Sequence, residues 1–598
     1  MKIVKDGIPR LLFYWDLQAT CPLETESQKG AFPLLGFRWL SEDLHPTPLV
    51  LEKENKTGFL FGSPVMGDSI APEKSLNHLM SGNSPVALNG QFLAFVFNKD
   101  SSDLLVYNDR YASIPVYYDY SCTGFFLSHR HSDIVRYNRQ ETGSCFVPER
   151  LFETIAFQRQ LLDRTLNDRS RYLLPASIMR ISKNGCDHQR YWRPDFTKRT
   201  DSVSSAGDEL SGLLQQSMKR RMSDGKRYGI YLSGGHDSRT VLMASPEKPV
   251  CFTVGYSDNY EVGCARQIAA AAGARFKFLK FPDDHQTLVA HQAAEICGGM
   301  YAIDNALFLG LEDQVRKEAD VVFHGHALDY LFQGMYLPAE YIKFLNRPTL
   351  LRRETGYWSD VASQFVETIP YRLKYVDLYE LCRPEWRARL RESMQNSAMA
   401  VIEDGRDICA DKADIWEYFL IHGLSRHYSW PNIGTKAIGV EQRTPAFDND
   451  VFDFYLSLRP EQRLTAGVLR RAQINLDRHI AMISTGNLGM PAAASPWVKT
   501  GWLMTRKLLR HMTGLQHLKA PSASDRTWPD RELHMQKVKS YQELAKHALQ
   551  SEQLADLLPF FDWNRVRQLG EESFEKANGG AGLMVNLIGL HLMLEGTD

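Results

Sequence analysis

One hexapeptide, Ser-Gly-Gly-His-Asp-Ser at residues 233–238, limits the possible folds of this chain more than any other feature. The apolar run RYGIYL leads into it, and a helix-like segment starting at Arg239 follows it. Glycines let backbone amides turn toward a phosphate, and a helix N-terminus adds N–H donors and a favourable dipole. Asp237 suits such a site only beside a divalent cation, since Mg²⁺ binds one or two carboxylates plus phosphate oxygens. We therefore predict a nucleotide site here; the alternative is a glycine-rich turn with an aspartate cap.

The surrounding pattern predicts a mixed fold of class α/β plus β, in two domains. Strand-like runs at 249–256, 275–281 and 319–325 alternate with helix-like segments at 208–222, 261–272, 286–297 and 303–317, which indicates a parallel, doubly wound sheet. Residues 370–598 are predominantly helical in pattern. Residues 1–195 contain short aromatic and β-branched runs between turn signals, which favours an antiparallel β-sandwich. We expect domains at 1–195 and 208–598, with the polar, serine-rich segment 191–207 as the linker.

Composition excludes several classes of protein. Lys plus Arg total 70 and Asp plus Glu total 71, so the chain has no overall basic footprint for nucleic acid, although residues 499–519 are locally basic. Nine scattered cysteines without a CxxC indicate a reducing compartment rather than a disulfide framework. No signal peptide and no run of roughly 18 apolar residues is evident, so we expect a cytoplasmic protein without membrane insertion.

A second glycine-containing segment, HGHALDYLFQG at 324–334, directly follows the apolar run ADVVF. Ligands of open α/β sheets bind at the carboxyl ends of the strands, so Asp329 is a candidate second carboxylate for Mg²⁺. The hexapeptide resembles the PP-loop of ATP pyrophosphatases, and this second segment is similar to the asparagine synthetase motif G-E-G-x-D-E-L-F-G-G. VEQRTPAFD at 440–448 and NDRYASIPVYY at 108–118 resemble two further motifs of the class B asparagine synthetases, in the same order.

The resemblance implies an N-terminal Ntn-hydrolase-type glutaminase sandwich and a C-terminal PP-loop ATP pyrophosphatase domain. Members of the family activate a carboxylate as its acyl-adenylate, with ATP and Mg²⁺, and an amine then forms the amide. By this resemblance Asp237 and Asp329 would hold Mg²⁺. The nucleotide would contact Leu232, Ser233, Gly234, Gly235, Asp237, Ser238, Val254 and Gly325.

The first domain departs from the family pattern. The glutaminase uses a cysteine exposed after removal of Met1, but residue 2 here is Lys and the first cysteine is Cys21. We therefore expect a pseudo-glutaminase that is a scaffold or a docking surface for a partner protein, with Arg110 as a structural ion-pair residue. The amine would then be free ammonia or part of a larger substrate, as in the β-lactam synthetases, the lasso-peptide cyclases and the asparagine-synthetase-like proteins of polysaccharide and natural-product clusters. The substrates would be small-molecule, peptide or glycan carboxylates and amines, and the sequence makes no prediction of oligomeric state.

The residues expected to move protons also differ. His326 replaces the Glu or Tyr that helps to deprotonate the amine, and a histidine with a pKa near about 6.5 could be that base. The alternative is a polar residue at a strand end. The acidic partner of the family falls near Ser429, and His427 is the candidate replacement.

The family lysine that balances the triphosphate has no counterpart in STGNLGMP at 484–491. The available cations are Arg239, Arg426, Lys436 and Arg443, and Arg239 follows the hexapeptide directly. We therefore expect Arg239 to stabilise the pyrophosphate leaving group.

Three other hypotheses remain open. Residues 484–496 could be a lid over the site or an ordinary interhelical loop. Glu261 could contact a ligand or be a first-turn helix charge. For the whole chain, the alternative to an amide ligase is a catalytically silent relative that is a scaffold or partner protein; another PP-loop chemistry, such as tRNA modification, fits the neutral charge less well.

Overall fold

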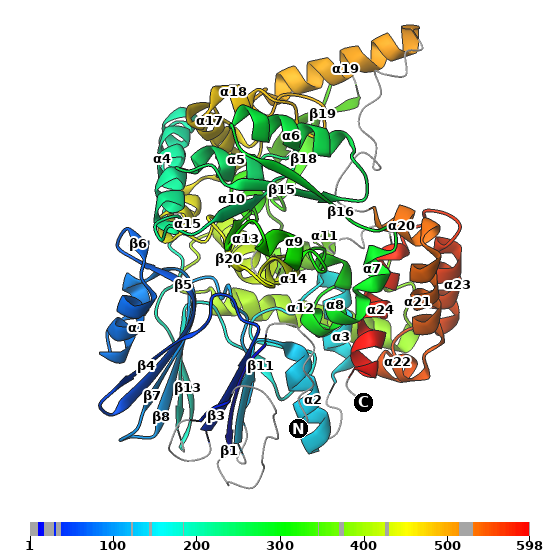
Figure 1. Ribbon diagram of the computed structural model, residues 1–598. Helices are drawn as coiled ribbons and strands as arrows, with labels where there is room; N and C mark the ends of the chain where they lie inside the picture. Colours follow the sequence, from blue (N-terminus) through cyan, green and yellow to red (C-terminus); the bar gives the residue numbers. More distant parts are fainter. Residues whose placement is uncertain are drawn as a thin grey trace.

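The computed structural model describes residues 10–16, 29–31, 37–120, 124–142, 146–182, 184–344, 346–369, 376–424, 430–513 and 530–596. Two antiparallel sheets form one end of the molecule, and a parallel sheet surrounded by helices forms the other (Figure 1). The mixed fold class predicted from the sequence is thereby confirmed at this level. Within the described ranges, none of the helices combines the length and the apolar character that crossing a membrane requires.

The first part is a sandwich of two sheets that pack face to face through aromatic residues. Phe13 and Phe95, one from each sheet, stack with ring centres 3.7 Å apart. The first sheet has the order β11-β9-β10-β1-β3-β2: β1 (Arg10–Asp16), β2 (Lys29–Ala31), β3 (Phe37–Glu42), β9 (Tyr117–Tyr120), β10 (Gly124–Ser128) and β11 (Arg171–Tyr172). The second has the order β13-β12-β8-β7-β5-β4, with β6 paired to β5: β4 (Leu49–Lys53), β5 (Lys56–Met66), β6 (Ser69–Ile70), β7 (Asn89–Asn98), β8 (Asp103–Asn108), β12 (Ser177–Ser182) and β13 (Gly185–Arg190).

Helices also belong to this first part, which the sequence pattern did not indicate. Helix α1 covers the outer face of the second sheet, and α2 packs against α8 of the second part. These helices are α1 (Pro72–Met80), η1 (Pro85–Ala87), α2 (His131–Thr142) and α3 (Pro148–Phe157). The two parts therefore share an extended contact; the Arg136 guanidinium, for example, donates to the carbonyl of Gly596 near the other end of the chain (3.1 Å).

The second part is built on a five-stranded parallel sheet with the order β16-β15-β14-β17-β20. Its strands are β14 (Tyr228–Tyr231), β15 (Val250–Gly255), β16 (Phe276–Lys280), β17 (Val321–Phe323) and β20 (Glu441–Arg443). Every pair is parallel, as the alternation of strand-like and helix-like segments predicted. Strands β14, β15, β17 and β20 are entirely buried because helices cover both faces of the sheet, whereas the edge strand β16 is only partly buried.

The helices between these strands are α4 (Val203–Arg221), α5 (Asp237–Ala244), α6 (Tyr260–Ala271), α7 (His285–Leu288), α8 (Ala290–Cys297), η2 (Ile303–Asn305), α9 (Glu312–Arg316) and α10 (Leu328–Phe332). Two predicted boundaries were wrong. Helix α4 begins inside the predicted linker because the Ser202 hydroxyl accepts a hydrogen bond from Ser205 N and caps it. Residues 303–317 contain only two short helical segments, because the chain between them folds over the sheet and buries Leu307 and Phe308.

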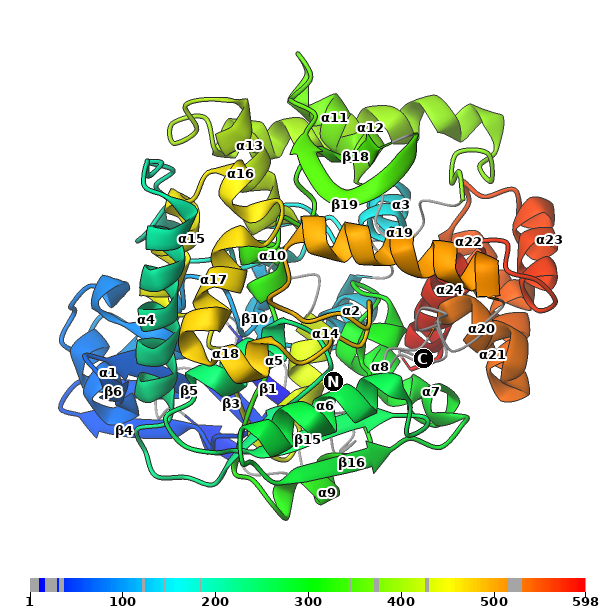
Figure 2. The same cartoon turned by 90° about the horizontal axis from the view of Figure 1, so that it is seen from above.

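The remaining helices are α11 (Val361–Thr368), α12 (Pro384–Asp404), α13 (Lys412–Phe419), η3 (Leu420–Leu424), α14 (Trp430–Lys436), α15 (Asn449–Ser457), α16 (Pro460–Arg463), α17 (Gly467–Leu476), α18 (Arg478–Ala481), α19 (Pro496–Thr513), α20 (Arg531–Lys537), α21 (Lys539–Gln550), α22 (Glu552–Leu557), α23 (Trp563–Ser573) and α24 (Ala581–Glu595). Helix α24 is apolar and buried on all sides, with α20–α23 around it. Strands β18 (Ala339–Phe344) and β19 (Arg347–Glu354) form a separate hairpin beside α19 (Figure 2).

Candidate active site

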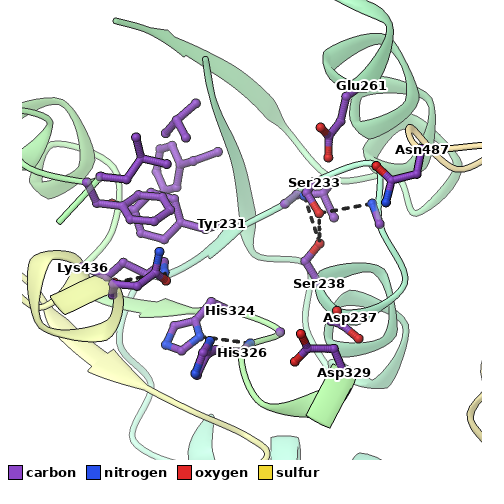
Figure 3. Close-up of a pocket in the computed structure, with 18 residues that line it drawn as sticks. Tyr231, Ser233, Asp237, Ser238, Glu261, His324, His326, Asp329, Lys436 and Asn487 are labelled. Atoms are coloured by element: carbon purple, nitrogen blue, oxygen red, sulfur yellow. Dashed lines mark hydrogen bonds between the residues drawn. The ribbon is translucent and has the colours of Figure 1, made fainter. Parts of the chain in front are cut away.

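A cavity of about 450 Å³ opens at the carboxyl ends of β14, β15 and β17 (Figure 3). Its walls come from the ends of these strands, from residues 233–238, which we call the glycine turn, and from α10 and α14. Most predicted nucleotide and metal residues meet here: Leu232, Ser233, Gly235, Asp237, Ser238, Val254, Gly325, His326 and Asp329. The glycine turn and the 324–334 segment thus define one continuous site.

The glycine turn holds itself in shape through its own hydroxyl groups. Ser233 N donates to Ser238 Oγ (2.9 Å), and Gly235 N donates to Ser233 Oγ (3.1 Å). Helix α5 starts directly at Asp237, and its N-cap residue His236 makes no side-chain cap hydrogen bond. The first-turn amides are therefore available to an anionic ligand, and the helix dipole favours one there.

Close backbone approach explains two of the glycines. A Cβ atom on Gly325 would lie 2.3 Å from both Asp237 C and Ser238 N, so only glycine lets the loop after β17 pack on the glycine turn. Gly234 was predicted to contact the nucleotide, but it does not line the cavity. Its carbonyl accepts a hydrogen bond from Gly486 N (3.1 Å) instead, so this residue connects the turn to the 484–496 segment.

Two carboxylates face each other at the floor of the cavity (Figure 3). Asp237 lies on the first turn of α5 and Asp329 on α10. Burial and the neighbouring Asp329 raise the pKa of Asp237 well above its ordinary value, and burial raises the pKa of Asp329 to about 6. Gln333 Nε2 donates to Asp237 Oδ1 (2.7 Å), but no Lys or Arg of the described residues forms an ion pair with either carboxylate. Two facing carboxylates without a cation fit Mg²⁺, which would complete its coordination with phosphate oxygens and water.

His326 lines the cavity beside these carboxylates. Its Nε2 atom has no hydrogen-bond partner among the described residues, and its ring packs edge-on against Tyr330. Burial, together with nearby Lys436, lowers its pKa to about 3. The imidazole is therefore neutral at neutral pH and its Nε2 is open, but a pKa of about 3 makes it a weak base in the ligand-free protein, which weighs against the proton-accepting role expected from the sequence. The other predicted histidine, His427, lies outside the described residues, as does Arg426.

His324 belongs to a hydrogen-bond network between the two parts of the molecule. His324 Nδ1 accepts from His326 N (3.2 Å), and its Nε2 donates to the amide oxygen of Gln442 (2.7 Å). Thr444 N donates to Gln91 Oε1 on β7 of the sandwich (2.6 Å). The sandwich is thereby joined to the wall of the cavity.

The position of Arg239 corrects the sequence prediction. It was expected to stabilise the leaving group, but it is fully buried and does not line the cavity. Its guanidinium donates to the carbonyls of Ile483 (2.6 Å) and Ser484 (2.9 Å), and also to those of Gly234 and Ile480. The physical reason is the helix period, since a residue two positions after Asp237 points to a different side of α5. Arg239 anchors the 484–496 segment to the glycine turn.

Lys436, at the end of α14, is the described cation that does line the cavity. Its ammonium donates to the backbone carbonyl (3.1 Å) and the side-chain oxygen of Asn432, and it lies 3.9 Å from the centre of the Phe308 ring. Burial lowers its pKa well below the ordinary value. Arg443, the fourth cation named from the sequence, is buried in ion pairs with Glu441 (2.6 Å) and Asp224 and does not reach the cavity.

Sequence reasoning missed an aromatic end of the cavity. Tyr231 and Phe252 lie next to the motif residues on their strands, so the strand pattern could have indicated them. The remaining missed wall residues come from distant segments and carry no local signal: Leu307, Phe308 and Asn432. Asn487 and Glu261 both line the cavity, so the 484–496 segment borders the site.

The motif at 108–118 is a structural element of the sandwich and of its contact with the second part. The buried Asp109 carboxylate accepts hydrogen bonds from Phe92 N, Tyr111 N and Ser113 N. Arg110 forms an ion pair with Asp453 on α15 (3.0 Å). The expected structural role of Arg110 is thereby confirmed.

Comparison with known proteins gives a family match over part of the chain. Residues 209–480 match the family model described as asparagine synthase. A probable asparagine synthetase (glutamine-hydrolyzing) of Acanthamoeba polyphaga mimivirus is 22% identical over 204 residues, which are 31% of this chain and 34% of that protein. The chain thus matches about a third of the length of that curated relative.

Two solved structures are similar to parts of the chain. A glutamine phosphoribosylpyrophosphate amidotransferase from B. subtilis, complexed with ADP and GMP, is 11% identical, with a TM-score of 0.16 over 39% of this chain and 48% of its own. An NH3-dependent NAD synthetase from Campylobacter jejuni is 14% identical, with a TM-score of 0.17 over 33% of this chain and 96% of its own.

Proposed function

We propose that the chain, whose residues 209–480 form an asparagine synthase family domain, is an ATP-dependent amide ligase that activates a carboxylate as its acyl-adenylate. It releases AMP and pyrophosphate and couples the acyl group to an amine that does not come from glutamine. The amine and the carboxylate belong to small-molecule, peptide or glycan substrates, and both can belong to one molecule, as in a lactam or macrolactam.

The observation that carries this proposal is the pair Asp237 and Asp329 beside the open N-terminus of α5. Amide donors at the helix start suit the phosphates of ATP, and the two carboxylates suit the cation that accompanies them. Mg²⁺ held there would neutralise phosphate charge and make pyrophosphate a better leaving group. A catalytically silent relative would have no use for two facing carboxylates whose charges are unpaired among the described residues.

The residues of this chain divide the work as follows. The amides of α5 and the glycine turn bind the phosphates in line with the substrate carboxylate. A carboxylate oxygen forms the bond to the α-phosphorus as the bond to the bridging oxygen of pyrophosphate breaks. The amine nitrogen then attacks the acyl carbon, the bond to AMP breaks, and the proton lost by nitrogen goes to His326 Nε2. Lys436 supplies positive charge from the opposite wall.

The first domain supports an amine source other than glutamine. Cys186 is the cysteine in the described part of this domain, and it lies on the edge strand β13. Burial raises its pKa to about 12, which opposes the thiolate that a nucleophile needs. We propose that the domain is a pseudo-glutaminase that stabilises the ligase domain and offers a docking surface. The described cysteines are all free, which fits a reducing, cytoplasmic location.

Pyrophosphate exchange into ATP tests the proposal. The full chain is incubated with labelled pyrophosphate and a panel of carboxylates and peptides, beside Asp237→Ala and the matched surface variant Asp320→Ala. Exchange that is lost in Asp237→Ala and retained in Asp320→Ala supports adenylation and identifies the acid. If calorimetry detects no ATP binding by the wild type, the proposal is wrong and the silent-scaffold alternative holds.

A further inference from the structure

Gln333 stands at a position where the motif that this segment resembles has glycine. In G-E-G-x-D-E-L-F-G-G, the first residue of the final glycine pair aligns with Gln333 and the second aligns with Gly334. Glycine offers no side chain to a neighbouring carboxylate, whereas the amide of glutamine has two N–H donors. The chain therefore carries a polar group next to the two carboxylates of the cavity that the motif does not provide.

The backbone places Gln333 on the same side of α10 as Asp329. The two residues are four positions apart, and Gln333 N donates to the Asp329 carbonyl (3.0 Å) at the end of the helix. The loop before α10 is constrained, because Gly325 packs on the backbone of Asp237 and Ala327 is held at a φ of 74°. Left-handed backbone is unfavourable for alanine and persists where the surrounding structure enforces it. The direction of α10 relative to α5 is thereby fixed.

The side chain of Gln333 reaches across to the carboxylate on the other helix. Its Nε2 donates to Asp237 Oδ1 (2.7 Å) on the first turn of α5. The amide presents its nitrogen, because an ionised carboxylate only accepts hydrogen bonds. Asp237 and Asp329 line the cavity, whereas Gln333 does not. The amide thus holds Asp237 from outside the cavity and leaves Oδ2 as the oxygen available to a cation.

We propose that Gln333 is a positioning residue that makes Asp237 bind its cation through Oδ2 alone and so makes the site selective for Mg²⁺ over Ca²⁺. This inference rests on the proposed function, which supplies the cation that accompanies ATP. Mg²⁺ requires octahedral geometry with short bonds, whereas Ca²⁺ accepts about six to eight oxygens and often takes both oxygens of one carboxylate. The hydrogen bond to Oδ1 opposes such two-oxygen binding and restricts rotation of the carboxylate.

Cation binding tests this inference without any turnover of substrate. The full chain is mixed with α,β-methylene ATP, which cannot release pyrophosphate, and titrated with Mn²⁺, whose free concentration is read by electron paramagnetic resonance. Displacement of Mn²⁺ then gives the affinities for Mg²⁺ and Ca²⁺. Gln333→Met keeps the length of the side chain and removes the donor. It should weaken Mg²⁺ binding by about tenfold or more and Ca²⁺ binding much less, so the Mg²⁺ to Ca²⁺ affinity ratio falls.

Two further variants separate positioning from packing. Gln333→Gly introduces the motif residue and should lower the affinity ratio as Gln333→Met does. Gln314→Met on α9 is the matched control, since Gln314 is exposed and distant in sequence from the motif, and it should keep the ratio of the wild type. A wild-type ratio in Gln333→Gly, or equal losses for both cations in Gln333→Met, overturns the proposal.

The same titration distinguishes failure of this inference from failure of the proposed function. A wild type that binds the nucleotide and Mn²⁺, with Gln333 variants that keep its affinity ratio, overturns the role of Gln333 alone. A wild type that binds neither the nucleotide nor Mn²⁺ overturns the proposed function together with this role.

Discussion

Asp329→Asn should make the ligand-free protein more stable while it abolishes binding of Mg²⁺-ATP. The pKa of Asp329 is raised from its ordinary value near 3.8 to about 6, a difference of about 2.2 units. An acid with a raised pKa keeps its proton in the folded state after the unfolded chain has lost it, so stability falls as pH rises from 3.8 to 6. At about 1.4 kcal/mol per pKa unit, the ionised Asp329 lowers the free energy of unfolding by on the order of 3 kcal/mol above pH 6. Water in the cavity screens the charge and reduces this loss to about 1–3 kcal/mol.

The pH dependence of the stability gain distinguishes removal of a buried charge from a general change in packing. The gain of Asp329→Asn over the wild type should be complete at about pH 8 and only about half as large at about pH 5. Urea unfolding of the ligand-free chain at both pH values measures it, and calorimetry measures ATP binding. Asp320→Asn is the control, because Asp320 pairs with Arg227 and its pKa is lowered, so its loss should not stabilise the protein. A destabilised Asp329→Asn at about pH 8, or a gain that does not change with pH, refutes the argument that burial of the ionised Asp329 carboxylate destabilises the fold.

Four further predictions test other parts of the site. The affinity for Mg²⁺-ATP should fall by up to about tenfold per unit as pH drops below the pKa of Asp329, about 6, because protons compete with the cation; titration calorimetry across this range measures it. Gly325→Ala should lose ATP binding and about 1–3 kcal/mol of stability, because its Cβ would overlap the Asp237 backbone. Gly263→Ala on α6 is the control, since open space surrounds it, and it should gain about 0.5–1 kcal/mol. Thermal unfolding compares the two variants. Arg239→Met should raise KM for ATP and speed proteolysis within 484–496, because the carbonyls of that segment lose their hydrogen-bond donor. A fall in kcat with unchanged KM would instead support the catalytic role predicted from the sequence. Lys436→Met should raise the melting temperature, because a buried charge is removed, and lower pyrophosphate exchange by about tenfold or more; unchanged exchange would exclude Lys436 from the site.

Local signals made the parallel sheet and the glycine turn predictable. Strand β14, the turn and α5 are contiguous, so one short segment contains the information for its own conformation. The alternation of strands and helices then requires parallel pairing, and parallel pairing brings the ends of β14 and β17 to one edge. Asp237 and Asp329 could therefore be paired from the sequence although 92 positions separate them.

The local sequence did not predict the direction in which the cationic side chains point. Arg239 follows the glycine turn directly, yet the packing of 484–496 over α5 gives its guanidinium four carbonyl acceptors away from the cavity. Lys436 carries no motif, and it reaches the site because α14 packs against α8 and η2, which brings its ammonium over the Phe308 ring at the cavity wall. Proximity along the chain therefore ranked the cations wrongly, because the direction of a side chain depends on what packs around its helix.

The sequence by itself determined the parallel sheet, the position of the glycine turn and the identity of the two carboxylates, because periodicity, glycine placement and strand–helix order are properties of contiguous segments. Only the tertiary structure decided which cation lines the cavity, which residues form its aromatic end and which side chain holds Asp237. Each of those depends on contacts between segments far apart in the chain. Such contacts are selected by the packing of the whole molecule, and no local pattern records them.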